Sequence, residues 1–303
     1  MRLFSRAGST RRRIGLALGG GGVRGLAHVG VLRVLSEAGV PIDAIAGVSM
    51  GAIVATAYAL TDRFPDHLIA LVRGFDVGPF KALPRNSEAG GVWTSVRRLL
   101  DIERFMISNV FSWGVAYDKG AGLAEALTGD RRLEDARVPL GVVACDLRSG
   151  ESVVFRTGSA ALALQASAAL PGFFQPVEHE GRLLADGGYV GMVPTWVARE
   201  MGADVVIAVD ANPMYAVAEI PNGLHATLRA LDITSQRYKE TLLEDADIAI
   251  RPDFGGPVET LDFSRIDECI DAGVRATRAA LPAIAALRPT THRARWPRRR
   301  RCR

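Results

Sequence analysis

A serine stands between two glycines in Gly47-Val48-Ser49-Met50-Gly51, where an apolar run over residues 42–46 gives way to helix-forming residues 52–60. This arrangement is typical of a nucleophile elbow, a sharp strand-to-helix turn that exposes a serine hydroxyl above a sheet edge. The turn also places Ser49 at a helix N-terminus, whose N–H groups stabilise negative charge. An ordinary tight turn is the alternative, since a chain with 32 glycines can contain the pattern by chance. We predict that Ser49 is a nucleophile.

A second glycine motif, Gly19 to Gly22, follows a predicted strand at 13–18 and precedes a predicted helix at 23–38. The run Gly20-Gly21-Gly22-Val23-Arg24-Gly25 fits the G-x-G-x-x-G pattern of dinucleotide-binding oxidoreductases, but the next strand ends in Ser49 and not in the expected acid. The alternative is chemical, because glycine N–H groups beside Ser49 would form an oxyanion hole for an ester carbonyl. This second interpretation explains both glycine motifs, and we prefer it.

A serine nucleophile needs a group that accepts its proton. The five histidines stand in a predicted helix (His28), polar helical segments (His67, His225), a predicted hairpin turn (His179) and the C-terminal basic run (His292). Asp186 follows the apolar run 183–185 and precedes two glycines that allow a sharp turn. A carboxylate with an ordinary pKa of about 3.9 is a weak base unless burial raises that pKa. We predict Asp186 as the base, with a simple Asp-Gly-Gly turn as the alternative.

The order of predicted elements indicates an α/β fold. A strand–helix–strand–helix opening favours a parallel sheet with right-handed crossovers. Further strands are predicted at 139–146, 152–155, 205–210 and 247–250, and further helices at 160–170, 195–201, 223–245 and 264–287. Residues 62–137 form a variable helical insert. Its large apolar side chains serve either helical packing or an apolar rim that meets lipid: Trp93, Leu99, Phe105, Met106, Phe111 and Trp113.

Charge is distributed unevenly along the 303 residues. The net charge is +4, yet residues 1–13 carry five arginines, residues 288–303 carry eight, and neither end has an acid. The remaining 24 basic and 33 acidic residues give residues 14–287 a net charge of −9. We expect a disordered basic leader over 1–13 and a disordered Arg-rich tail over 288–303. The tail is either a solvated segment or a peripheral contact with anionic membrane, with Trp296 as an anchor, and nucleic acid is the less favoured partner.

The location expected from the sequence is the cytoplasm, either in solution or in peripheral contact with the inner face of the membrane. No apolar run reaches the roughly 18–20 residues of a membrane span. The N-terminal residues lack the apolar region of a secretory signal, and a transit peptide is a weaker alternative to a disordered leader. Cys145, Cys269 and Cys302 are too widely spaced for a metal site or a disulfide framework. We expect neither a metal nor another cofactor, and the oligomeric state is left open.

Five motifs taken in order resemble the patatin-like phospholipases, specifically the short bacterial branch related to the catalytic domain of neuropathy target esterase. They are GGGGVRGLAHVGVL (19–32), GVSMG (47–51), ASAALPGFFQPV (166–177), LLADGGY (183–189) and GADVVIAVD (202–210). The resemblance spans roughly residues 14–287. It implies a three-layer α/β/α fold with a mostly parallel central sheet.

The resemblance also implies a role for each motif residue. Ser49 and Asp186 would form a Ser–Asp dyad without histidine, and the N–H groups of Gly21, Gly22 and Met50 would line the oxyanion hole. Arg24 would bind substrate phosphate or hold the loop. The remaining motif glycines are Gly20, Gly25, Gly47, Gly51, Gly187 and Gly188. The implied activity is hydrolysis of fatty-acyl esters of phospholipids, lysophospholipids or related lipids through an acyl-enzyme.

One position departs from the family pattern. Members often carry Asn five residues after the Asp, and a Pro three residues later; here the first position is Gly191, while Pro194 is retained. If that Asn braces the Asp loop, Asp186 would be held less rigidly. The rival hypothesis is therefore a non-catalytic lipid-binding or regulatory module in which the dyad is poorly aligned.

Overall fold

The computed structural model describes residues 11–75, 117–216 and 219–287. The cluster of large apolar residues from Trp93 to Trp113, the first ten residues and the arginine-rich run 288–303 lie outside these ranges. The expectations attached to them therefore stay predictions. Residues 11–13, assigned above to the leader, contact the domain: Arg11 forms an ion pair with Asp43 at 2.7 Å, and the Arg13 N–H donates to the Asp204 carboxylate at 2.8 Å.

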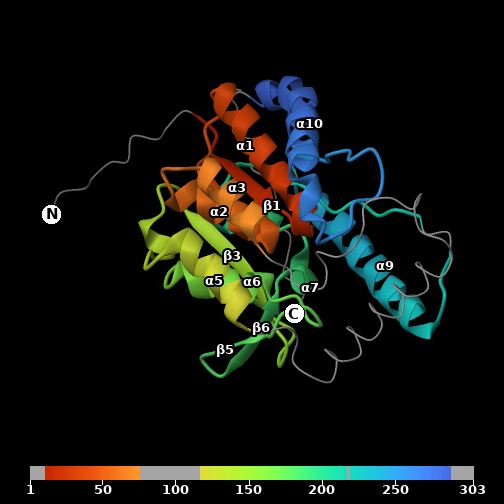
Figure 1. Ribbon diagram of the computed structural model, residues 1–303. Helices are drawn as coiled ribbons and strands as arrows, with labels where there is room; N and C mark the ends of the chain where they lie inside the picture. The colour runs from red at the N-terminus through yellow and green to blue at the C-terminus, as the bar shows by residue number, and fades with distance from the viewer. Residues whose placement is uncertain (1–10, 76–116, 217–218, 288–303) are drawn as a thin grey trace, which may run out of the picture.

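One sheet forms the centre of the described fold (Figure 1). Its strands are β1 (Ile14–Leu18), β2 (Ala44–Val48), β3 (Leu140–Asp146), β4 (Ser152–Phe155), β5 (Val177–His179), β6 (Arg182–Asp186), β7 (Val205–Val209) and β8 (Ile248–Ile250). The order is β5-β6-β3-β2-β1-β7-β8, and β4 also pairs with β3. β3, β2, β1, β7 and β8 run parallel, whereas β4, β5 and β6 join by antiparallel pairs.

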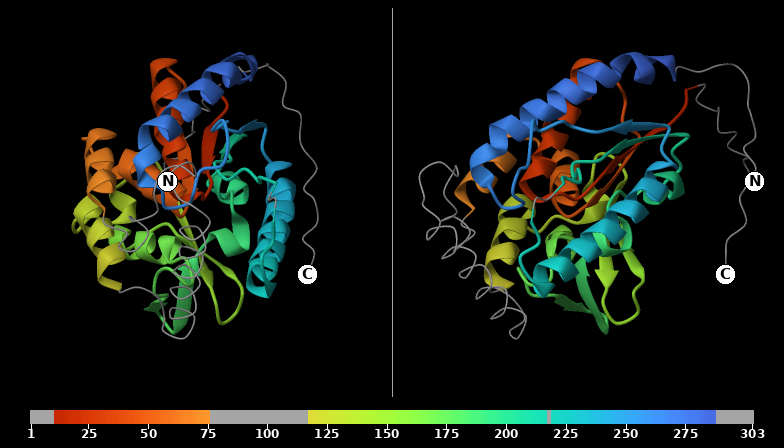
Figure 2. Two further views of the ribbon diagram at one scale, coloured as in Figure 1. Left: turned by 45° about the vertical axis from the view of Figure 1, so that its right-hand side comes forward. Right: turned by 90° about the vertical axis from the view of Figure 1, so that its right-hand side faces the viewer.

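Helices cover both faces of the sheet (Figure 2). They are α1 (Ala27–Glu37), α2 (Met50–Leu60), α3 (Asp66–Gly74), α5 (Tyr117–Thr128), α6 (Ala160–Ala168), α7 (Gly188–Gly191), α8 (Thr195–Glu200), α9 (Gly223–Leu243) and α10 (Ile266–Ala286), with 3₁₀ turns η1 (Gly22–Leu26), η3 (Leu133–Asp135) and η4 (Phe263–Arg265). α1, α10, α2 and α6 form one layer, with α3 and α5 packed outside it, and α7, α8 and α9 lie on the other face. The expected three-layer α/β/α fold is confirmed.

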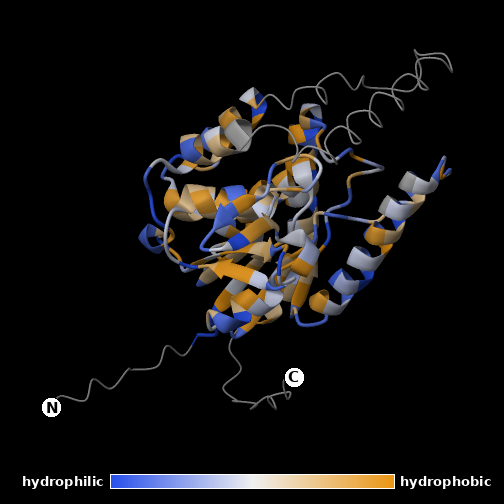
Figure 3. Cartoon of the chain, turned by 90° about the horizontal axis from the view of Figure 1, so that it is seen from below, coloured by the Kyte–Doolittle hydropathy of each residue, from blue (hydrophilic) through white to orange (hydrophobic). Residues whose placement is uncertain are grey.

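Strand residues alternate between the two faces of the sheet, as a period of two requires. In β1, Leu16 and Leu18 join the large core under α1 and α2, while Ala17 joins the core under α8. In β7, Ile207 and Val206 divide in the same way. Because both faces are covered, these strands are apolar throughout, and Figure 3 shows hydrophobic residues along the central strands. The glycine and serine turns therefore stand at the ends of rigid, buried strands.

Most predicted elements are present, and the first helix is the main difference. It was expected to run unbroken from residue 23, but it opens with the 3₁₀ turn η1, and the α-helix starts at Ala27. Gly25 within this turn packs against Met50, since a Cβ on Gly25 would lie 2.7 Å from the Met50 Cβ. The turn therefore brings the glycine loop against the start of α2. None of the helices in the described ranges is long and apolar enough to cross a bilayer.

Candidate active site

Strand register brings Ser49 and Asp186 together. β4 pairs with Val142 to Cys145 along one edge of β3, and β2 and β6 share the other edge. β2 ends with Val48 opposite Val143, and β6, running the other way, ends with Asp186 opposite the next residue, Ala144. The two strands therefore meet end to end, and Ser49 emerges from β2 at the point where Asp186 closes β6.

Ser49 has the backbone conformation of an elbow. Its φ of 54° and ψ of −125° lie in a region that residues with a Cβ rarely adopt, at a cost of about 1–3 kcal/mol. The flanking glycines allow the turn because backbone atoms crowd both of them. A Cβ on Gly47 would lie 2.5 Å from the Ala52 Cα, and one on Gly51 would lie 2.3 Å from the Leu18 carbonyl oxygen. The sequence G-x-S-x-G is therefore required by close approach of the chain on both sides of the serine.

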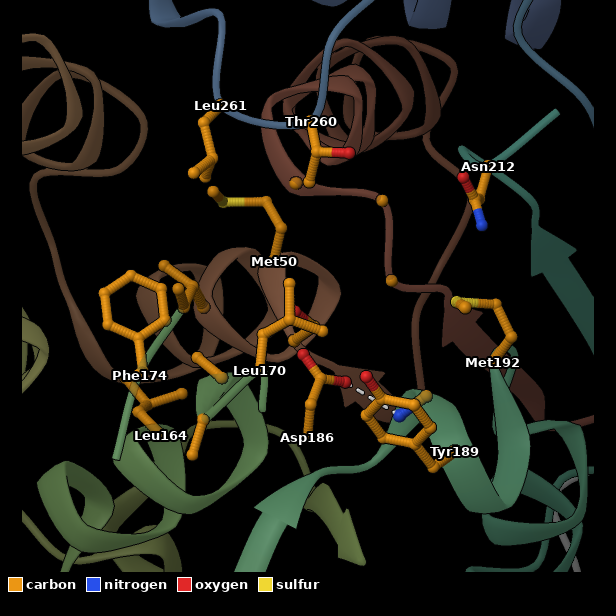
Figure 4. A pocket seen from close by; sticks show the side chains of 18 of the residues that line it. Met50, Leu164, Leu170, Phe174, Asp186, Tyr189, Met192, Asn212, Thr260 and Leu261 are labelled. Atoms are coloured by element: carbon orange, nitrogen blue, oxygen red, sulfur yellow. Dashed lines mark hydrogen bonds between the residues drawn. The ribbon is translucent and has the colours of Figure 1, made fainter. Parts of the chain in front are cut away.

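Asp186 is buried and held from its own loop. The Gly188 N–H donates to Oδ1 of Asp186 at 2.8 Å, the bond drawn in Figure 4. Burial raises the pKa of Asp186 to about 6, and this rise is opposed by the Ser49 side chain and the Gly188 N–H, which favour the ionised form. A carboxylate with this pKa is a stronger base than an exposed aspartate and is ionised at neutral pH.

The glycine loop leaves backbone N–H groups free beside Ser49. The Gly20 N–H donates to the Met192 carbonyl at 3.0 Å, and the Val23 N–H donates to the Thr260 carbonyl at 2.8 Å. Within the described residues, no acceptor is found for the N–H groups of Gly21, Gly22 or Met50. All three residues line the cavity that contains Ser49. These are the N–H groups that the family resemblance implies for an oxyanion hole.

Arg24 supports the same loop. Its Nε donates to the Gly21 carbonyl at 3.1 Å, and its Nη2 lies 3.5 Å from Oγ1 of Thr260. Burial lowers the pKa of this half-buried guanidinium, and among the described residues no carboxylate lies within ion-pair distance of it. Arg24 also lines the cavity. Its contacts fit the loop-holding role, and its position leaves a cation available to an anionic ligand.

None of the four described histidines lines the cavity. Buried His28 lies behind the glycine loop, with Nε2 2.8 Å from the Gly19 carbonyl oxygen. Because a carbonyl can only accept, Nε2 carries the hydrogen, and burial lowers the pKa of His28 to about 4, so the ring is neutral. Among the described residues that line the cavity there is no histidine. The described part of the chain also contains no cluster of three metal-ligating side chains.

The cavity beside Ser49 has a volume of about 610 Å³ and two kinds of wall. Its apolar side comes from α2, α3, α5 and α6, with Ile53, Val72, Ala124, Leu127 and Leu164 among the lining residues. Its more polar side comes from the glycine loop, the segment after β7, α9 and the segment before η4, with Arg24, Asn212, Asp232, Ser235 and Thr260. In Figure 4, Leu164, Leu170 and Phe174 lie to one side of Asp186, and Tyr189 and Met192 lie to the other.

The structure adds residues that sequence reasoning left without a role. Thr260 closes over the glycine loop so tightly that a Cβ on Gly22 would lie 2.2 Å from its carbonyl oxygen. Nothing in the sequence around Thr260 signals this contact across more than 200 residues. Met192 and Ser167 bind backbone N–H groups of the two turns. Ser167 lies inside the motif at 166–177, and Met192 lies shortly after the motif at 183–189.

Comparison with known proteins points to one family. The sequence profile of the patatin-like phospholipases matches residues 16–199. Patatin-like phospholipase domain-containing protein 7 of the mouse, Mus musculus, is 30% identical over 301 residues, which cover 89% of this chain and 20% of that protein. An uncharacterized NTE family protein of Mycobacterium tuberculosis is 32% identical over 300 residues, which cover 90% of this chain and 47% of that protein.

The chain thus spans about a fifth of the mouse relative and about half of the mycobacterial one. Among solved structures, VipD from Legionella pneumophila has a TM-score of 0.48 at 17% identity, covering 89% of this chain and 67% of that chain. The family match extends from β1 to α8 and includes the glycine loop, the Ser49 elbow and the Asp186 turn. The chain belongs to the patatin-like phospholipase family.

Proposed function

We propose that this chain hydrolyses fatty-acyl esters of phospholipids, lysophospholipids or related lipids, with Ser49 as nucleophile and Asp186 as base. The observation that carries the proposal is the meeting of Ser49 and a buried Asp186 at one cavity whose far wall is apolar. Family membership supports hydrolysis of a lipid ester. The apolar wall formed by α2, α3, α5 and α6 suits an acyl chain, and the polar wall suits the rest of the lipid.

The first half of the reaction transfers the acyl group to the enzyme. Asp186 takes the proton from the Ser49 hydroxyl as Oγ attacks the ester carbonyl carbon, which gives a tetrahedral oxyanion. The N–H groups of Gly21, Gly22 and Met50 stabilise that oxyanion, each donor contributing about 3–4 kcal/mol in comparable sites. The intermediate then collapses, the ester C–O bond breaks, and Asp186 returns the proton to the departing alkoxide. The fatty acid is left esterified to Ser49.

The second half releases the acid. A water molecule enters where the alcohol has left, gives its proton to Asp186 and attacks the acyl carbon. Collapse of this second oxyanion breaks the bond to Ser49, and the proton on Asp186 passes to Oγ. The dyad returns to its starting state, and no further proton carrier is required. The desolvation that raises the pKa of Asp186 is what makes a lone carboxylate suitable for both proton transfers.

Labelling with a fluorophosphonate probe tests the nucleophile directly, because the probe phosphonylates activated serines. We expect wild type to be labelled once per chain and Ser49→Ala to lose labelling and turnover of a lysophospholipid. Ser235→Ala is the matched control, since Ser235 lines the same cavity from α9 and its hydroxyl has no part in the proposed reaction. Circular dichroism and thermal unfolding would verify that each variant is folded.

Two results would contradict the proposal. Turnover retained in folded Ser49→Ala protein would place the nucleophile elsewhere. A folded wild type that neither reacts with the probe nor turns over lipid esters, yet binds fatty-acyl ligands, would instead favour the non-catalytic lipid-binding module.

A further inference from the structure

The motif at residues 166–177 has no role in the reaction proposed above, although its first residues lie at the end of α6, next to both reacting side chains. Ser167 in this motif is fully buried, with 0% of its surface exposed. A buried hydroxyl is costly unless it is hydrogen-bonded. Its partners therefore indicate what the residue does.

Ser167 is bonded to two other parts of the fold. The Ser49 N–H donates to its Oγ at 2.9 Å, and its own hydroxyl donates to the Val143 carbonyl of β3 at 2.7 Å. A serine hydroxyl carries one hydrogen. Because that hydrogen is directed to Val143, Oγ meets the Ser49 N–H as an acceptor. Ser167 is thus a one-residue bridge between the serine turn and β3.

The same helix end also binds the chain at Asp186. The Asp186 N–H donates to the Ala169 carbonyl at 2.9 Å, two residues after Ser167. A Cβ on the next residue, Gly187, would lie 2.2 Å from the Val143 carbonyl oxygen, the atom that accepts the Ser167 hydroxyl. The end of α6 therefore holds the main chain of both reacting residues against one position of β3.

Among the described residues, no strand of the sheet accepts a hydrogen bond from the Ser49 N–H. β2 ends at Val48, and the edge of β3 that would continue its ladder is taken by β6 from Ala144 onward. Ser49 has left the extended conformation at this point, with a φ of 54°. A strained residue persists only where its surroundings fix it. Ser167 supplies an acceptor where the ladder can no longer do so.

We propose that Ser167 is a positioning residue that fixes the Ser49 turn through its backbone N–H and sets the direction of the Ser49 hydroxyl toward Asp186. This proposal rests on the hydrolase function above. By engaging the Ser49 N–H, Ser167 also leaves the following N–H, that of Met50, as the donor from this turn to the oxyanion. Ser167 acts through Ser49 and does not touch the reacting atoms.

The test compares Ser167→Ala with Ser159→Ala. Both substitutions remove a serine hydroxyl from the α6 region, since Ser159 caps the start of α6 by accepting from the Leu162 N–H at 3.3 Å. We expect Ser167→Ala to lower kcat and the rate of fluorophosphonate labelling by about 10- to 100-fold, with KM within about twofold, because small misplacements of a nucleophile have effects of this size. Ser159→Ala should lower the melting temperature and leave kcat per folded molecule unchanged.

A second measurement separates this proposal from the hydrolase proposal. Hydrogen exchange at the Ser49 amide, followed by NMR in the full chain, should be at least about tenfold faster in Ser167→Ala than in wild type. If the Ser49 amide exchanges faster in Ser167→Ala but wild type never reacts with the probe, the positioning role is retained and the hydrolase proposal is overturned. Restored kcat in Ser167→Thr, which keeps the hydroxyl, would support the proposal further. Wild-type kcat and labelling in folded Ser167→Ala would overturn it.

Discussion

The indole ring of Trp196 fills the space beside Gly191 that a larger side chain would need. A Cβ on Gly191 would lie 2.2 Å from Cη2 and 2.5 Å from Cζ3 of that ring. Trp196 lies on α8 and Gly191 ends α7, so the contact joins two short helices on one face of the sheet. The glycine that departs from the family pattern thus has a local explanation in the packing of Trp196. Asp186 is meanwhile held by the Gly188 N–H.

Gly191→Ala should destabilise the fold by about 1–3 kcal/mol, because the added methyl group overpacks a filled site. Urea unfolding would measure the loss. Gly122→Ala is the matched control, since nothing lies within 4 Å of a Cβ at that position in α5, and alanine there should be neutral or stabilising by up to about 1 kcal/mol. Adding Trp196→Leu to Gly191→Ala should recover part of the loss. Equal stability of Gly191→Ala and wild type would contradict the packing argument.

Activity should depend on the ionisation of Asp186. The base must be deprotonated to accept the serine proton, and burial raises its pKa to about 6. We therefore expect kcat/KM for an uncharged ester to rise about tenfold per pH unit below pH 6 and to level off above pH 7. A stopped assay between pH 4.5 and 8.5, with folding checked at each pH, measures this. A profile that is flat from pH 5 to 8 would exclude Asp186 as the base.

The same pKa affects stability in the opposite sense to activity. Because the folded pKa of Asp186 lies above its unfolded value of 3.8, the folded state favours the protonated form. Stability from this group is present below about pH 4 and is lost as pH rises through 6. A shift of about two units corresponds to about 3 kcal/mol.

Asp186→Asn carries no titrating group at this position, so its stability should not fall as the pH rises through 6. Its free energy of unfolding relative to wild type should increase between pH 4 and pH 7 and stay constant above. Urea unfolding of both proteins at several pH values tests this prediction. A difference between the two proteins that does not change with pH would show that Asp186 has no raised pKa in the fold.

The sequence was most informative where a local pattern has one structural solution. G-x-S-x-G between a strand and a helix predicted the turn at Ser49, because each flanking residue is crowded by backbone in the fold. Alternation in β1 and β7 could not be seen, since both faces are buried, yet the short apolar runs at 14–18 and 205–209 still located the strands. The hairpin turn predicted around His179 is present between β5 and β6, where Glu180 and Gly181 both have positive φ.

Contacts between segments that lie far apart in the chain could not be predicted from the sequence. The bond from the Ser49 N–H to Ser167 spans 118 residues, and no property of either residue alone reveals it. The approach of Thr260 to Gly22 depends on how the segment before α10 returns to the sheet. The sequence also gave no sign that Lys239 is the most fully buried cation of α9. It forms an ion pair with Asp210 at the end of β7, at 2.7 Å. Such pairings are set by the packing of whole elements.

The apolar wall of the cavity should set the acyl-chain length. Ala124 lies on α5 with 4% of its surface exposed and lines this wall. Ala124→Phe should fill part of the space along this wall. We expect kcat/KM for the p-nitrophenyl ester of a long fatty acid to fall at least about tenfold more than kcat/KM for p-nitrophenyl butyrate. The long chain loses more buried methylene groups, and each buried methylene contributes about 0.8 kcal/mol to binding. Ala126→Phe adds the same volume to the exposed side of α5 and is the control. Equal losses on both esters would remove Ala124 from the acyl site.

The two roles open to Arg24 predict different substrate effects. Its Nε bond to the Gly21 carbonyl holds the loop whose N–H groups we assign to the oxyanion, so the loop role affects every ester. Phosphate binding would affect only substrates that carry phosphate. We expect Arg24→Lys, which keeps the charge but lacks this planar fork of donors, to lose about tenfold in kcat on both p-nitrophenyl butyrate and a lysophospholipid. The phosphate role predicts a different result. Arg24→Lys would then keep full activity on both substrates, and Arg24→Met would lose activity on the lysophospholipid alone.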